Sequence, residues 1–256
     1  MSFESFFQQS LSAEPQRYRS LRGSIVAMSE SEAAGLHGKL ASSDWQENLQ
    51  AAIFNLWREH ADQVNFIRRV AFGIEPSLNP QQYMTGKPSV FESARSIVEL
   101  GKDFLPAAAE IVYREPDTLT NYAFQVCTEA LTNWKDDRIV PVYRHLMFNA
   151  GMKEEYRRGA IRLLIAFAYD SLYDDLMAIY QYAENPIDLR ATALEGLGAT
   201  KSPGAIAFLR IEIGNLENQP RFREAAAFGL AETHLSAAAD ILLEQLTVTN
   251  DSKVKQ

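Results

Sequence analysis

Apolar residues recur along this chain at the spacing of one face of a helix. Ala193 and Leu197 lie four residues apart, and the same interval begins again eight residues later, at Ala205. A four-residue interval places both side chains on one face of an α-helix, so two helices are expected here. The residues between them, 198–203, contain a glycine and a Ser-Pro pair, which are typical of the end of one helix and the beginning of the next. The pattern therefore predicts a helical hairpin.

The hairpin pattern repeats with a period of 33 residues. An arginine begins each of three copies, and a small residue follows three positions later. The arginines are Arg157, Arg190 and Arg223, and the small residues, with one earlier copy, are Cys127, Ala160, Ala193 and Ala226. A constant period indicates stacked units, because one hairpin cannot bury its apolar stripe alone. We expect such units at residues 44–72, 90–115, 121–150, 154–184, 187–215 and 220–246.

The segment Arg190-x-x-Ala193-x-x-Gly196-Leu197-Gly198 resembles the short bacterial HEAT-like repeat, the type also found in phycobilisome lyases. The resemblance covers about residues 92–246 and is clearest in the last three units. It implies an all-α fold, a right-handed α-solenoid of about six HEAT-like helical hairpins. The ankyrin signature Thr-Pro-Leu-His is absent. Because one fold hosts many activities, the resemblance predicts architecture better than function.

The remaining segments divide the chain further. Residues 1–43 are expected to form an N-terminal helical cap, in which residues 2–12 make a short amphipathic helix. A capping box at residues 29–32 and another at residues 43–46 predict two helix starts, the second of which opens the solenoid at 44–246. Residues 247–256 are polar and predict a flexible tail.

An insertion at residues 73–89 separates the first two units and is rich in proline and glycine. Two interpretations remain open for it. The segment is either a tolerated surface insertion or a functional loop in which Tyr83 helps to hold a partner at the groove edge.

Charge and cysteine usage narrow the class of partner. The chain has 25 Lys and Arg against 33 Asp and Glu, a net charge of −8, and its basic residues form no cluster larger than a doublet. Phosphate binding needs a basic face, so we expect no nucleic-acid partner. A single cysteine and the absence of a secretory or membrane-spanning apolar segment favour a cytoplasmic protein with no membrane partner.

The candidate chemistry is sparse. The four histidines do not have metal-ligand spacing, and Cys127 occupies the small-residue position of the repeat, so we interpret it as a core residue. The glycine-rich segment 196–204 follows a helix and completes no phosphate-loop motif. The recurrent arginines are expected to form hydrogen bonds between units. The sequence therefore predicts no catalytic, metal or cofactor site.

The residues that do not repeat indicate a candidate binding surface. In HEAT-like proteins the second helices line the concave face, and the resemblance implies the same orientation here. By helical angle the outward side chains there are apolar at the centre, with arginines beside them and carboxylates at the C-terminal end. With Tyr83, these candidate binding residues are Arg144, His145, Phe148, Asp174, Tyr182, Arg210, Ile211 and Glu244.

We therefore expect a non-enzymatic scaffold or adaptor that binds a protein or peptide along this face. The alternative is a cofactor-handling or lyase-type enzyme of the bilin-lyase class. That alternative is suggested by the repeat type alone.

Overall fold

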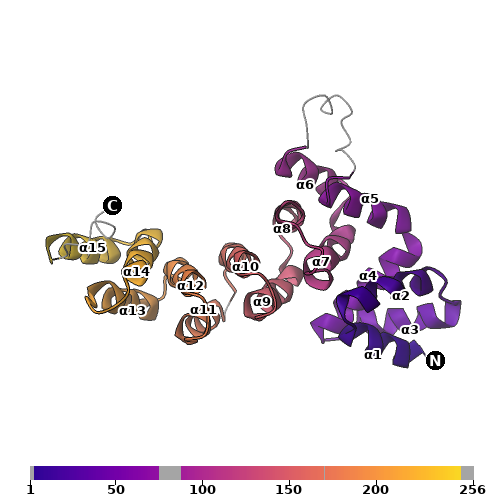
Figure 1. Cartoon of the computed structure of the whole chain (residues 1–256), viewed down its shortest axis with the longest axis horizontal. Coiled ribbons are helices and arrows are strands. Elements are labelled where there is room, and N and C mark those ends of the chain that lie inside the picture. Colours follow the sequence, from indigo (N-terminus) through magenta and orange to yellow (C-terminus); the bar gives the residue numbers. More distant parts are fainter. Residues whose placement is uncertain (1–2, 75–87, 170, 249–256) are drawn as a thin grey trace. The chain divides into compact units, whose positions relative to one another are not determined.

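The structure is a computed structural model that describes residues 3–74, 88–169 and 171–248, with side chains described up to residue 245 (Figure 1). Within these ranges the regular secondary structure is helical throughout, with fifteen α-helices, short 3-10 turns and no strand. The predicted all-α class is therefore confirmed. The chain divides into two compact units, residues 1–139 and 140–256. The border falls inside the range 121–150, which the sequence pattern assigned to one hairpin.

The first unit contains eight α-helices in its described residues. They are α1 (Phe3–Ser12), α2 (Pro15–Val26), α3 (Glu30–Leu40), α4 (Trp45–Glu59), α5 (Ala61–Ala71), α6 (Val90–Val98), α7 (Leu105–Arg114) and α8 (Asn121–Trp134). Helix α4 is central, because it contacts α1, α2, α3, α5 and α7. One face of α4 is buried, and Phe54 on it meets the ring of Phe7 edge-on at 6.0 Å between centroids. The amphipathic N-terminal helix is thus packed onto the core.

The two predicted capping boxes have different outcomes. At the start of α3, the backbone N–H of Ser29 donates to the Glu32 carboxylate at 2.8 Å, as expected. The box predicted at residues 43–46 is wrong. Helix α4 is capped by Asp44, whose carboxylate accepts hydrogen bonds from the amides of Gln46 and Glu47 at 2.8 and 3.2 Å. An ionised Asp satisfies two of the free amides of the first turn, so the neighbouring serine is not needed as a cap.

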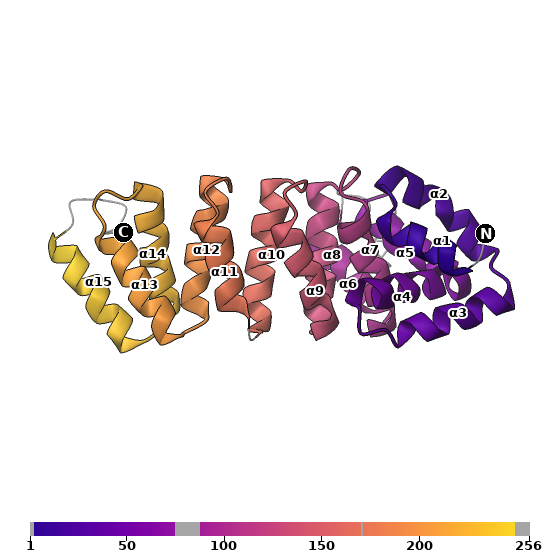
Figure 2. The ribbon, with the colours of Figure 1, turned by 90° about the horizontal axis from the view of Figure 1, so that it is seen from below.

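The second unit contains the remaining seven helices. They are α9 (Val140–Phe148), α10 (Glu154–Phe167), α11 (Leu172–Gln181), α12 (Ile187–Ala199), α13 (Pro203–Gly214), α14 (Pro220–Glu232) and α15 (Ser236–Val248). Helices α10, α12 and α14 lie side by side and contact one another in sequence (Figures 1 and 2). We call these the first helices and α9, α11, α13 and α15 the second helices. Helices α9, α11 and α13 each pack against the first helix that follows in the chain, so the core lies between consecutive hairpins.

The core of the second unit uses the small and apolar positions of the repeat. Ala160, Ala193 and Ala226 are fully buried, as is Leu197. Helices α12 and α14 approach so closely that a Cβ atom on Gly198 would overlap the main-chain carbonyl oxygen of Gly229. The recurrence of small residues therefore has a packing cause: it lets the first helices come together.

A left-handed backbone conformation recurs with the 33-residue period at four turns, and the residue at each of these four positions is not a glycine. They are Lys135, Ala168, Lys201 and His234, each with φ between 45° and 55°, and each separated from the next by 33 residues. In the second unit these residues follow the first helix of each hairpin. The repeat thus imposes one backbone geometry on unrelated side chains, at a cost that glycine would avoid.

Two predictions fall partly or wholly outside the described residues. Residues 75–87 of the insertion, including Tyr83, lie outside them, and Ser89 at its end caps helix α6. Of the expected tail, residues 247 and 248 belong to helix α15, and 249–256 lie outside the described part.

Candidate binding surface

Eight of the nine candidate binding residues lie on the second unit, on or directly after the second helices. Their side chains are exposed or half-buried, as the helical-angle prediction requires. Residues opposite the buried face of a packed helix point outward. They are Arg144, His145 and Phe148 from α9, Asp174 and Tyr182 from α11 and its end, Arg210 and Ile211 from α13, and Glu244 from α15.

Arg144 is held by a carboxylate that the sequence did not reveal. Its Nε and Nη2 atoms donate to the two oxygens of Asp175 on α11, at 2.6 and 2.9 Å. Tyr169 donates its hydroxyl to the same carboxylate at 2.5 Å, and the guanidinium lies over the Tyr169 ring, 5.6 Å from its centroid. The hydrogen bonds that Arg144 donates to Asp175 raise the pKa of Arg144, whereas burial and the nearby carboxylate raise the pKa of Tyr169. The bidentate pair ties α9 to α11.

Two further contacts join the next second helices. The Tyr180 hydroxyl on α11 donates to Glu212 on α13 at 2.7 Å, and burial together with this carboxylate raises the pKa of Tyr180 to about 12. Arg210 on α13 pairs with Glu244 on α15 at 3.0 Å, with both side chains more than half exposed. Consecutive second helices are thus linked by polar contacts, which hold their outward residues in a defined arrangement.

Large apolar side chains remain exposed among these contacts. Phe148 is 43% exposed, and Tyr182, Ile211 and Leu243 are each more than 60% exposed. Leu243 occupies the same repeat position as Arg144 and Arg210, so the repeat predicts that it lies beside the surface, although it was not among the candidate binding residues. We call these four apolar residues, with the ion pairs Arg144–Asp175 and Arg210–Glu244, the second-helix surface.

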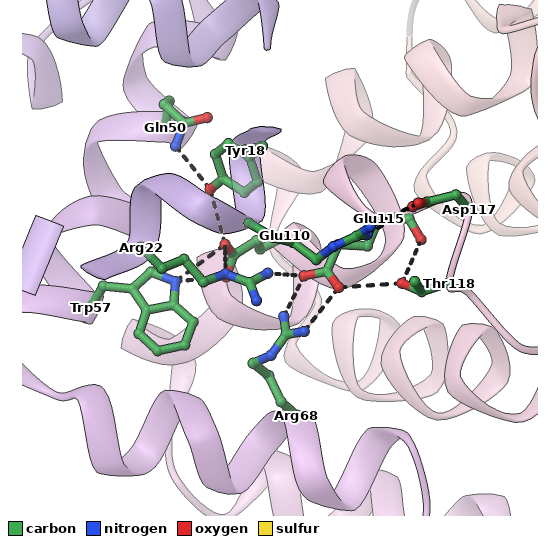
Figure 3. Close-up of polar contacts among 10 residues, drawn as sticks. Tyr18, Arg22, Gln50, Trp57, Arg68, Glu110, Glu115, Asp117 and Thr118 are labelled. Atoms are coloured by element: carbon green, nitrogen blue, oxygen red, sulfur yellow. Dashed lines mark hydrogen bonds and ion pairs between the residues drawn. The ribbon is translucent and has the colours of Figure 1, made fainter. Parts of the chain in front are cut away.

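The sequence did not predict the buried polar network of the first unit, which Figure 3 shows. Glu110 on α7 is fully buried and accepts hydrogen bonds from the hydroxyl of Tyr18 at 2.9 Å and from the indole Nε1 of Trp57 at 3.0 Å. Gln50 in turn donates to the Tyr18 oxygen. Burial raises the pKa of Glu110, and the charges of nearby arginines oppose this rise. Gln50 and Trp57 share the buried face of α4, but Tyr18 comes from α2 and Glu110 from α7, so no local spacing reveals the network.

Glu115 anchors the other end of this network. Arg68 donates hydrogen bonds to both carboxylate oxygens of Glu115, one of them from Nη2 at 2.9 Å. Arg22 also forms an ion pair with Glu115. Burial acts to raise the pKa of Glu115, but hydrogen bonds and charge from the two arginines outweigh it and lower the pKa. Both carboxylates are hydrogen-bonded to side chains of other helices, so the network ties α2 and α5 to the end of α7. We assign it to stability, since a buried ion pair that loses one partner costs several kcal/mol.

The structure gives the cysteine no reactive character. Cys127 is fully buried in α8, and burial raises the pKa of its thiol to about 12. A thiol in this state is a poor nucleophile at neutral pH, because the thiolate is the reactive form. In the part of the chain that the structure describes, no group of three or more His, Cys, Asp or Glu side chains is placed to bind a metal ion. None of the helices described is long and apolar enough to cross a membrane.

Comparison with known protein families yields no matching family, and no curated protein matches the chain.

Proposed function

We propose that this protein is a non-enzymatic scaffold or adaptor that binds a segment of another protein on the second-helix surface. The observation that carries the proposal is the exposure of Phe148, Tyr182, Ile211 and Leu243 on successive second helices of one unit. Large exposed apolar and aromatic side chains are costly to leave in water and are typical anchors of interfaces.

The polar contacts of the same surface support this function. Arg144 and Arg210 are already paired with carboxylates of the neighbouring second helix, so their side chains are ordered before a partner arrives. A surface ordered in advance loses less conformational entropy on binding. The paired arginines can also rim the apolar anchors, and a polar rim around an apolar centre is the usual anatomy of a protein interface.

We further propose that the helix pairs form a right-handed HEAT-like solenoid. The repeated arginines, the small residues of the first helices and the left-handed turn residues all follow the same 33-residue period. In such a solenoid the second helices would line a continuous concave face, long enough for an extended or helical segment. The alternative of a cofactor-handling or lyase-type enzyme of the bilin-lyase class is suggested by the repeat type, and the burial and raised pKa of Cys127 weigh against that residue as its nucleophile.

The test begins with a photo-crosslinking residue at position 211 of the full chain, which identifies the partner. The partner is then purified, and its affinity is measured for the wild type and three variants by isothermal titration calorimetry. Ile211→Asp and Phe148→Ala are expected to weaken binding about tenfold, as interface anchors do. Phe91→Ala is the matched control, since Phe91 is more exposed than either Phe148 or Ile211 but lies on α6 of the first unit.

The control is expected to leave the affinity within about twofold of the wild type. The proposal fails if the purified partner binds Ile211→Asp as tightly as the wild type. It also fails if crosslinking at position 211 captures nothing that a crosslinker at position 91 does not.

A further inference from the structure

A cavity of about 750 Å³ opens on the first helices of the second unit, away from the residues of the second-helix surface. Helices α10, α12 and α14 all contribute to it. Its lining residues are Arg162, Ile165, Thr192, Glu195, Gly196, Ala199, Arg221, Glu224, Phe228 and Glu232. The volume lies within the range of known ligand sites.

Three lining residues occupy the same position of the repeat but differ in chemistry. Arg162, Glu195 and Phe228 are each 33 residues apart. Where a side chain bonds to the preceding hairpin the repeat keeps one residue type, as it does with Arg157, Arg190 and Arg223. Because this position holds a basic, an acidic and an aromatic residue in successive units, its side chain cannot have the same packing role in each. The variation indicates a surface that contacts something outside the chain.

Helix α14 presents an aromatic ring between two carboxylates. Glu224, Phe228 and Glu232 are four residues apart, so they form one stripe along the helix. Phe228 is 53% exposed, and the exposed Glu232 forms no ion pair with any residue in the described ranges. An exposed ring with a carboxylate one turn away is well suited to a cation, which gains both the ring face and an ion pair.

The charge at this end of the cavity is negative. Arg221 is already engaged by three carboxylates, Asp188 at 3.2 Å, Glu195 at 2.9 Å and Glu224 at 3.3 Å. One guanidinium shared among three carboxylates leaves the cluster negative, and Glu232 adds a fourth carboxylate. Arg162 lies on α10, two hairpins before Phe228, and is the positive end of the cavity.

We propose that this cavity binds an arginine side chain presented by a partner protein, with the guanidinium over the ring of Phe228 and paired with Glu232. Arginine fits better than lysine because its planar, weakly hydrated guanidinium stacks on aromatic rings and binds a carboxylate through two hydrogen bonds. Ile165 and Ala199 also line the cavity and supply apolar surface for the aliphatic stem of the arginine. This site is separate from the second-helix surface and does not depend on it.

The test uses two pentapeptides with the full chain at low salt, acetyl-Gly-Gly-Arg-Gly-Gly-amide and the same peptide with neutral citrulline in place of arginine. Binding is followed by amide chemical shifts in two-dimensional NMR spectra. The arginine peptide is expected to shift amides of α12 and α14, and to bind at least about fivefold more tightly than the citrulline peptide. Phe228→Leu and Glu232→Gln are each expected to weaken it about three- to fivefold.

Asp240→Asn is the matched control, because it removes one exposed carboxylate of α15 that does not line the cavity. This variant is expected to bind the arginine peptide within about 1.5-fold of the wild type. Circular dichroism of each variant checks that the exposed substitutions leave the helices intact.

Three results would overturn the proposal: equal affinity for the arginine and citrulline peptides, shifts confined to α13 and α15, or no shift up to about 10 mM peptide. Wild-type affinity in both cavity variants would overturn it as well, since the cation would then be held elsewhere.

Discussion

The guanidinium Nε–H of Arg157 donates a hydrogen bond to the main-chain carbonyl oxygen of Met147, at 2.9 Å. The same contact joins Arg190 to Tyr180 at 2.7 Å and Arg223 to Ile213 at 3.2 Å. In each case the acceptor is the penultimate residue of the preceding second helix, where the last carbonyls have no partner within their own helix. One arginine per repeat therefore caps the end of one hairpin from the start of the next.

Substitution of Arg157 tests this ladder. Arg157 is buried and also donates to the side-chain oxygen of Asn185 at 2.8 Å, so Arg157→Met removes two hydrogen bonds from a charged donor. We expect a loss of about 2–3 kcal/mol in the free energy of unfolding, measured by urea denaturation. Arg162→Met on the same helix is the control, since that side chain is exposed, and its effect is expected to stay within about 0.5 kcal/mol. Similar losses in both variants would show that the ladder contributes nothing specific.

The close approach of α12 and α14 makes Gly198 intolerant of any side chain. Because a Cβ atom there would overlap the backbone of Gly229, Gly198→Ala must push two helices apart. We expect a destabilisation of about 2 kcal/mol or more, measured by thermal and urea unfolding. Gly23→Ala is the contrasting change, since no atom lies within 4 Å of its Cβ position in α2, and it is expected to stabilise the protein by up to about 1 kcal/mol. A neutral Gly198→Ala variant would contradict the packing of these two helices.

The buried carboxyl of Glu110 makes stability depend on pH in a direction opposite to that of most acidic residues. Its pKa is raised by burial, so the folded protein binds this proton more tightly than the unfolded chain does. The corresponding stability is present below the unfolded pKa of about 4.3 and is lost as pH rises through the folded pKa. The wild type loses this stability as pH rises, whereas Glu110→Gln has no carboxyl group to ionise at this position. The free energy of unfolding of Glu110→Gln, minus that of the wild type, should therefore increase with pH over this interval, even if the variant is the less stable protein at low pH.

Urea denaturation at a series of pH values from about 4 to 8 measures this difference. Glu99→Gln, which removes an exposed carboxylate of a surface ion pair, is the control and is expected to run parallel to the wild type. A stability difference between Glu110→Gln and the wild type that does not change with pH would contradict the raised pKa.

Lys201 occupies one of the recurrent left-handed positions, with φ of 51°. Lys201→Gly relieves the steric cost of a Cβ atom in this region, and we expect it to stabilise the protein by about 0.5–1 kcal/mol. The neighbouring Thr200 has φ of −68° and donates its hydroxyl to the Leu197 carbonyl at 2.7 Å. Thr200→Gly should therefore destabilise the protein, by about 1 kcal/mol. Thermal unfolding of both variants distinguishes backbone relief from a general effect of glycine.

The thiol of Cys127 should resist alkylation as long as the protein is folded. With its pKa raised to about 12 and its side chain fully buried, little thiolate is present and reagents cannot reach it. At pH 8 we expect iodoacetamide to react at least about 100-fold more slowly with the native protein than with the urea-unfolded chain. Ser31→Cys in a Cys127→Ala background supplies an exposed thiol as the control. Fast alkylation of native Cys127 would revive a nucleophilic role for this residue.

The helical character of the chain and its small buried positions were predictable from local patterns. Ala193 and Leu197 share a face because of their spacing, and the 33-residue period placed the turns between helices. The outward orientation of residues such as Ile211 was predictable from the same geometry, since residues opposite the buried face of a packed helix must point outward. These features depend on contacts within one helix or between equivalent positions, which sequence records directly.

Partnerships between helices were decided only by the tertiary structure. The pairing of Arg144 with Asp175, and of Glu110 with Tyr18 and Trp57, depends on the distances at which separate helices cross, and no local spacing encodes those distances. The left-handed conformation of Lys201 is another case, because local preference favours glycine there, whereas the packed hairpin imposes the turn on whatever residue occupies the position. Periodicity thus determines which residues face inward, while packing determines which of them meet.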